Sequence, residues 1–209
     1  MPGVNAVSCA VDPTNGELAV TDYGNEKGNG AMVVVYPKAK GSPRLYIDSN
    51  LSSSDFLNYA YCGYDNTDDL FVDGTHTAGY ESPIVAELPR GGTALLTLKL
   101  SQGIGWLSGV QWDGKYLAVG QAVKPYIFRY KISGTTGTLV SATPLSDATN
   151  AFQFVFAGKR VVVSNYYFED RYIYKWNVLI YKYPAGGNST QEIPTNGFPV
   201  SSVALSRRR

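Results

Sequence analysis

Residues 7–24 read VSCAVDPTNGELAVTDYG and residues 32–48 read MVVVYPKAKGSPRLYID, and together they decide the fold. Four short segments in them, VSCAV, ELAVT, MVVVY and PRLYI, are rich in β-branched and aromatic residues, which favour strands. Turn-forming residues separate these segments, most clearly in DPTNG and PKAKG. Four strands joined by three turns predict an antiparallel meander, which is the blade of a β-propeller.

The same unit recurs along the chain. Asp12 aligns with Asp65 in YCGYDNTDDLFVDG and with Asp113 in GVQWDGKYLAVG, whereas the fourth unit, FVFAGKRVVVSN, has Ala157 at this position. The aligned positions are about 44 to 53 residues apart, which is the range expected of propeller repeats. A β-sandwich with accidental self-similarity is the alternative.

We therefore predict an all-β fold, with a single β-propeller domain over residues 1–209 built from four-stranded antiparallel blades. The four blades are expected at residues 4–51, 52–103, 104–147 and 148–197. The sequence PVSSVAL predicts one extra C-terminal strand within residues 198–206. Either four blades close tightly and this strand docks on an edge, or the ring is incomplete within one chain and the edge pairs with a second chain. Because an unpaired apolar strand edge pairs readily with another chain, we expect a homo-oligomer, a dimer or larger, joined through the terminal blade edges.

Composition narrows the function classes. The net charge is +1, which argues against a nucleic-acid or anionic-membrane surface. No apolar run approaches transmembrane length, and Met1-Pro2-Gly3 does not begin a secretory signal. Cys9 and Cys62 share a register position and are expected to be buried thiols, with a disulfide as the alternative. Two cysteines and one histidine exclude a Cys-rich zinc framework.

The segments VDPTNGELAVTD, YCGYDNTDDLFVDG, GVQWDGKYLAVG and YKYPAGG resemble the repeat-propeller proteins of soil bacteria, which are similar to the NHL and gluconolactonase-like (SMP-30-type) propellers. The resemblance covers nearly the whole chain. It implies a propeller fold and, as in the gluconolactonase-like relatives, a metal at the axis held by Asn, Asp and Glu side chains. No axial Glu matches that pattern here. Such relatives generally carry an export signal and further upstream strands, which implies a chain shortened at its N-terminus and leaves its compartment open.

Polar residues recur where loops converge at one end of the propeller axis, before the first strand and after the second strand of each blade. Ligand sites often form at such convergences. We expect a site for a polar small molecule or a glycan lined by Asn5, Asp22, Asn58, Trp106, Gln121, Asn150 and Asn165. The alternative is that Asn and Asp at loop–strand junctions cap backbone groups.

An oxygen-rich ring of this kind also fits Ca²⁺ or another divalent cation, with Asn58, Asn150 and Asp73 as ligands. His76, the sole histidine, is a candidate general base beside Asp73, with a solvated loop histidine as the alternative. Three functions follow. The first is a non-catalytic recognition or scaffold module, the second a lactone or ester hydrolase with or without a divalent cation, and the third a structural assembly protein that pairs through open blade edges.

Overall fold

The computed structural model describes residues 6–22, 32–47, 57–76, 83–170, 173–196 and 198–205. Within these ranges the secondary structure is β-strand, apart from one short 3₁₀ helix, η1 (Pro37–Ala39). None of the described residues belongs to a helix that is long and apolar enough to cross a bilayer. The chain is therefore organised by sheets, as its alternation of strand and turn residues predicts.

The strands form four sheets, and most pair with the next strand along the chain. The first sheet contains β1 (Ala6–Val11), β2 (Leu18–Asp22), β3 (Met32–Tyr36) and β4 (Arg44–Tyr46). The second contains β5 (Leu57–Tyr64), β6 (Leu70–His76), β7 (Pro83–Leu88) and β8 (Leu96–Thr97). The third contains β10 (Leu107–Trp112), β11 (Leu117–Gln121), β12 (Tyr126–Ser133) and β13 (Thr136–Pro144). The fourth contains β14 (Asn150–Ala157), β15 (Arg160–Asp170), β16 (Ile173–Lys182) and β17 (Gln191–Pro194).

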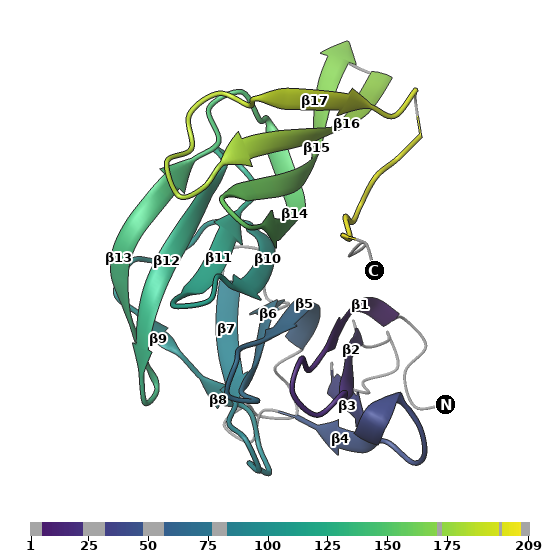
Figure 1. Ribbon diagram of the computed structural model, residues 1–209, viewed down its shortest axis with the longest axis vertical. Helices are drawn as coiled ribbons and strands as arrows, with labels where there is room; N and C mark the ends of the chain where they lie inside the picture. The colour runs from purple at the N-terminus through teal and green to yellow at the C-terminus, as the bar shows by residue number, and fades with distance from the viewer. Residues whose placement is uncertain are drawn as a thin grey trace.

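The sheets are the blades of a propeller, and we number them 1 to 4 in chain order. The first strand of each blade packs on the first strand of the next, so that β1 contacts β5, β5 contacts β10 and β10 contacts β14. Figure 1 shows the blades fanned out from blade 1, in purple, to blade 4, in green and yellow. The predicted β-propeller of four-stranded antiparallel blades is confirmed. A short fifth strand, β9 (Lys99–Leu100), joins the outer edge of blade 3 parallel to β13.

Apolar side chains fill the space between consecutive blades. Val33 and Val35 of blade 1 pack in one core cluster with Cys62, Leu70 and Val72 of blade 2. Similar clusters join blade 2 to blade 3 and blade 3 to blade 4. Successive side chains of a strand point to opposite faces of the sheet, and so toward the preceding and the following blade in turn. Both faces of an inner blade are therefore apolar, as the clusters on either side of blades 2 and 3 show.

Two details of the sequence prediction need correction. Residues 198–205 form no strand; the Val203 N–H donates to Oε1 of Gln153 on β14, at 3.2 Å. Both cysteines are free, but only Cys62 is buried and Cys9 is exposed. Cys62 faces blade 1, whereas the described residues place no blade before blade 1 to cover Cys9.

Candidate functional site

The predicted axial site lies at the end of the blades where first strands begin and second strands end. Asn5 lies outside the described residues, as do the side chains of Asn58 and His76. Asp22 is buried. Trp106 lies just before β10, and its side chain is 54% exposed. Trp106 is thus the described member of this set that presents a large apolar surface to solvent.

The structure brings together the members from blades 3 and 4. An isolated bridge pairs Val123, in the loop after β11, with Asn150. The Asn150 N–H donates to Oδ1 of Asn165 at 3.1 Å, and Asn165 Nδ2 donates to Asn177 Oδ1 at 2.8 Å. Asn165 therefore holds the start of β14 against β15, which is a backbone-capping role.

Gln121 has a similar structural role. Its Oε1 accepts from the Gly105 N–H at 2.9 Å, and its Nε2 donates to the carbonyls of Val123 and Lys124 at 3.0 and 3.1 Å. Gly105 directly precedes Trp106. Gln121 thus fixes the loop that carries the exposed indole ring.

One position of the second strand stabilises a bulge in the first strand of most blades. Register shifts interrupt β1, β5, β10 and β14 near their starts. The Ser8 N–H donates to Thr21 Oγ1 at 3.1 Å, the Tyr61 N–H to Asp73 Oδ1 at 2.7 Å, and the Gln153 N–H to Ser164 Oγ at 3.0 Å. Bulges are recurrent designed features of sheets, so the polarity of this position has a structural cause.

Asp73 is the bulge-capping residue with unusual electrostatics. Its side chain is fully buried, and within the described part of the chain its Oδ2 has no hydrogen-bond partner. Burial raises the pKa of Asp73 to about 7, against the opposing effect of the backbone N–H groups of Tyr61 and Gly109. A carboxyl group with this pKa can hold or release a proton near neutral pH.

The predicted metal ligands come from different blades. Asn58 and Asp73 belong to blade 2 and Asn150 to blade 4, and β10 packs between β5 and β14. Among the described side chains, no group of three or more His, Cys, Asp or Glu residues is arranged to hold a metal ion. The Asn-based cation site stays a prediction.

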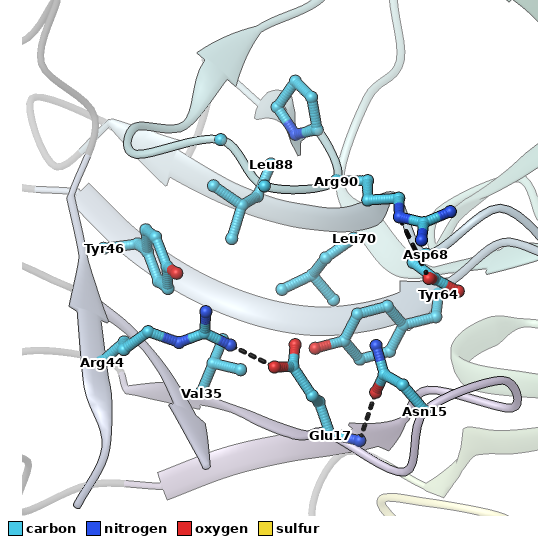
Figure 2. Close-up of a pocket in the computed structure, with 13 residues that line it drawn as sticks. Asn15, Glu17, Val35, Arg44, Tyr46, Tyr64, Asp68, Leu70, Leu88 and Arg90 are labelled. Atoms are coloured by element: carbon cyan, nitrogen blue, oxygen red, sulfur yellow. Dashed lines mark hydrogen bonds and ion pairs between the residues drawn. The ribbon is translucent and has the colours of Figure 1, made fainter. Parts of the chain in front are cut away.

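A pocket of about 290 Å³ lies at the opposite end of the blades, between blades 1 and 2. We call it the inter-blade groove. Its lining residues are Asn15, Glu17, Val35, Arg44, Tyr46, Tyr64, Asp68, Leu70, Leu88, Pro89, Arg90, Gly91 and Gly92. Figure 2 shows the rings of Tyr46 and Tyr64 with Leu70 and Leu88 forming its apolar wall.

The rim of the groove carries two ion pairs. Arg44 contacts Glu17 within blade 1, and Arg90 Nε lies 3.5 Å from Asp68 Oδ2 within blade 2 (Figure 2). The hydroxyl group of Thr14 donates to Asp68 and so links the two blades. Two cations therefore face two anions, and these four groups carry no net charge.

Acidic side chains near this end of the blades raise the pKa values of neighbouring groups. Burial raises the pKa of Tyr64 above its usual range, and the charges of Glu17 and Asp12 add to this effect. Burial likewise raises the pKa of Glu87 to about 7, with further contributions from Asp69 and Asp65. The same acidic groups disfavour an anionic ligand near this end of the blades.

Sequence reasoning missed the groove. Residues 65–69 form a turn in blade 2, and Asp65 caps it, since its Oδ1 accepts from the N–H groups of Thr67 and Asp69 at 2.7 and 3.0 Å. The available signal was the coincidence of this turn with Arg90 in the LPRGG turn of the same blade.

Comparison with known proteins identifies the fold. No protein-family model matches the chain, and no curated protein matches its sequence. Three solved structures resemble it over most of its length. The first is the Kuenenia stuttgartiensis hydrazine synthase, with 12% identity and a TM-score of 0.63 over 92% of this chain and 49% of that one. The second is the xyloglucan PUL GH43B of Bacteroides ovatus, with 14% identity and a TM-score of 0.57 over 94% of this chain and 42% of that one. The third is the β-propeller domain of the trilobed protease from Pyrococcus furiosus, described as having an open velcro topology, with 9% identity and a TM-score of 0.51 over 93% of this chain and 57% of that one. The chain thus spans about half the length of these structures, and what it shares with them is the β-propeller fold.

Proposed function

We propose that this propeller is a recognition module for a neutral, hydroxyl-rich small molecule or a glycan, and that the inter-blade groove is its binding site. The observation that carries the proposal is the charge-balanced rim of Arg44, Glu17, Arg90 and Asp68 above an apolar wall with two tyrosines. Pockets that combine apolar walls with a few convergent polar groups are typical ligand sites.

The pairing of the rim charges favours a neutral ligand. An ionic ligand would have to displace one partner of an existing ion pair, and the desolvation free energy of the charged groups would oppose its binding. A hydroxyl group can instead accept from an arginine and donate to a carboxylate without breaking either pair. The side chain of Arg90 is 73% exposed, so its N–H groups are accessible to such a ligand. Tyrosine rings add flat surfaces on which a sugar ring can pack.

The axial face is the second candidate site for the same class of ligand. The exposed indole ring of Trp106 supports it, together with the amide groups that surround the loop at Gln121 and Asn150. In the groove model this face is structural, whereas in the axial model the indole ring packs against the ligand.

Substitutions can separate the two sites. We expect a panel of neutral mono- and oligosaccharides, titrated by NMR or calorimetry, to contain at least one ligand. Arg90→Gln combined with Arg44→Gln should weaken binding about tenfold or more, since it removes charged donors, while Trp106→Ala should leave it unchanged. Lys131→Gln, on the exposed outer part of blade 3, is the matched control. The reverse result would place the ligand at the axial face, and no binding anywhere in the panel would refute the recognition function.

A hydrolase of lactone or ester type is the alternative function, in keeping with the resemblance to gluconolactonase-like propellers. Asp73 supports it, because a carboxyl group with a pKa of about 7 suits general acid–base catalysis near neutral pH. His76, three residues further along β6, is the second candidate general base. In a separate, metal-assisted form of the mechanism, a Ca²⁺ or similar ion at Asn58, Asn150 and Asp73 would polarise an ester carbonyl and hold Asp73 ionised. Turnover of lactones and aryl esters, measured with and without EDTA and with Asp73→Asn, tests this alternative. Rates equal to buffer would exclude it.

A further inference from the structure

The two end blades each expose a sheet face of the kind that is buried between the inner blades. We call the face of a blade that looks toward the preceding blade its front face, and the opposite one its back face. In blade 2, the front face contains the cross-strand row Cys62, Val72 and Ala86. All three side chains are buried in the core between blades 1 and 2.

Blade 1 repeats this front face residue for residue. Cys9 pairs with Val20 and Val20 with Val34, in the same register as the row in blade 2. The row continues to Leu45 on β4, which pairs with Val34. A second row begins with Val11 opposite Leu18. These residues form an apolar surface that matches a buried inter-blade surface in position and in chemistry.

The margins of this front face are open among the described residues, whereas Val20 is half-buried and Val34 at its centre is only 3% exposed. Val11 is 60% exposed and Leu45 is 51% exposed. The side chains at the position of Cys9 in the other three blades, which are Cys62, Val110 and Phe154, are buried. Blade 1 therefore has the front face of an inner blade, and no sheet among the described residues packs on that side.

Blade 4 shows the complementary situation on its back face. The pairs Val162–Ile180 and Ser164–Val178 stand in the register of Ala19–Val35 and Thr21–Val33 of blade 1. Those valines of blade 1 are buried against blade 2, whereas Val178 and Ile180 are only half-buried.

Aromatic and aliphatic side chains extend this back face. Phe152, Tyr166 and Trp176 form a cluster with ring centroids 5.1 to 5.6 Å apart. On β17, Ile193 pairs with Val178 and is 44% exposed. Blade 4 thus offers a wide apolar surface toward the position of a following blade.

We propose that the front face of blade 1 docks on the back face of blade 4 of a second copy of this chain, and that the reciprocal contact closes a ring of two copies. Each copy carries one face of each kind, so a two-fold arrangement buries all four faces. The new junctions would repeat the three apolar junctions already present between blades. One copy covers 57% of the β-propeller domain of the trilobed protease, so a single copy accounts for little more than half of a propeller of that length.

The junction pairs two different faces, and this sets it apart from a contact between like faces. A dimer built through blade 1 alone would leave the aromatic back face of blade 4 open. A chain of head-to-tail contacts that does not close would give a series of larger species. Solution mass and variant behaviour separate these arrangements.

The first test is the mass of the intact chain by size-exclusion chromatography with light scattering. We expect a single species of twice the 22.7 kDa of one chain. Val11→Asp and Ile193→Asp, placed on opposite faces, should each raise the dimer dissociation constant by about 100-fold or more, because each would bury an unpaired carboxylate. Val140→Asp, at an exposed position of β13, is the control and should remain dimeric. Circular dichroism and thermal unfolding show whether the variants are folded.

The decisive test mixes the two variants. A Val11→Asp copy retains an intact back face and an Ile193→Asp copy an intact front face, so the mixture can form one good junction and should associate where neither variant does alone. A wild-type monomer at every concentration would overturn the proposal, as would a ladder of larger masses. A mixture that stays monomeric would also overturn it, as would an Ile193→Asp variant that dimerises as the wild type does.

Discussion

Tyr183 donates its phenolic hydrogen to Oδ2 of Asp113 at 2.8 Å, so a side chain that follows β16 of blade 4 binds the carboxylate in the β10–β11 turn of blade 3. The Nε of Arg129 donates to the same oxygen at 2.6 Å. The backbone N–H groups of Lys115 and Tyr116 donate to Oδ1 at 2.9 and 2.8 Å. The Asp113 carboxylate thus stabilises the β10–β11 turn, binds Arg129 of β12 in the same blade, and links blade 3 to blade 4 through Tyr183.

Replacing Asp113 with Asn should destabilise the chain by about 1 to 3 kcal/mol, because the partly buried guanidinium group of Arg129 loses its anion while the turn keeps an acceptor. Urea unfolding of Asp113→Asn, Arg129→Gln and the double variant would measure the coupling. Additive single effects would show that the ion pair contributes nothing.

The same carboxylate predicts acid sensitivity. Its hydrogen bonds hold the pKa of Asp113 below the ordinary 3.8. The stability that it contributes is therefore present above about pH 4 and is lost as the pH falls through the lowered pKa. Between pH 4.5 and pH 2.5, wild type should lose more unfolding free energy than Asp113→Asn. Parallel curves for the two proteins would contradict this assignment.

Titration of Asp73 should make the free energy of unfolding fall, rather than rise, with increasing pH near neutrality. Because burial raises its pKa from 3.8 to about 7, the folded chain binds a proton more tightly than the unfolded chain. Stability should therefore fall by about 1 to 3 kcal/mol between pH 5 and pH 8. Asp73→Asn should make this slope shallower, and the remainder should come from Glu87, whose pKa burial also raises to about 7. Asp113→Asn is the matched control and should keep it, since Asp113 titrates at lower pH.

Gly120 should be intolerant of a side chain. A Cβ atom there would lie 2.2 Å from Ser108 Oγ and 2.9 Å from the Ser108 carbonyl oxygen. We expect Gly120→Ala to cost about 1 to 3 kcal/mol through overpacking. Gly103→Ala, which meets no atom within 4 Å, should be nearly neutral. Equal unfolding free energies for the two variants would show that β10 shifts to make room.

Thiol labelling gives an independent readout of the end faces. Cys62 is buried and burial raises its pKa above the ordinary range, whereas Cys9 is exposed. In folded monomeric Ile193→Asp, a maleimide reagent should therefore modify Cys9 quickly and Cys62 only after unfolding. In the proposed dimer, Cys9 lies at the junction. Its labelling rate in wild type should fall as protein concentration rises, and a constant rate would argue against burial there.

The sequence was enough to predict the blades because each is a local meander with its own turn residues. The aligned Asp12, Asp65 and Asp113 are a case in point: each accepts backbone N–H groups of its own turn. Ala157 breaks the pattern in the two-residue turn that follows β14, where Gly158 adopts a positive φ of 63° and needs no carboxylate cap. Such short-range rules can be read directly from a sequence.

Features that depend on contacts between blades could not be predicted in the same way. The groove needs Tyr46 from β4 and Leu88 from β7 to face each other, and strand periodicity alone does not give that distance. Cys9 and Cys62 look equivalent in sequence but differ in exposure, because the preceding blade decides the burial. The candidate axial residues were placed by position along strands, yet Gln121 and Asn165 turned out to bind backbone groups, which only side-chain geometry reveals.

The short strand β9 has a mechanical consequence. The segment that connects blade 2 to blade 3 passes along the rim of the molecule and pairs at Lys99–Leu100 with Thr136–Gly137 of β13. The backbone hydrogen-bonding groups of this part of the β13 edge are therefore occupied, and a strand of another chain cannot pair with it in an amyloid-like manner. A force that pulls blade 2 away from blade 3 must also break the β9–β13 hydrogen bonds. We therefore expect blades 2 and 3 to unfold in a single event in an optical trap.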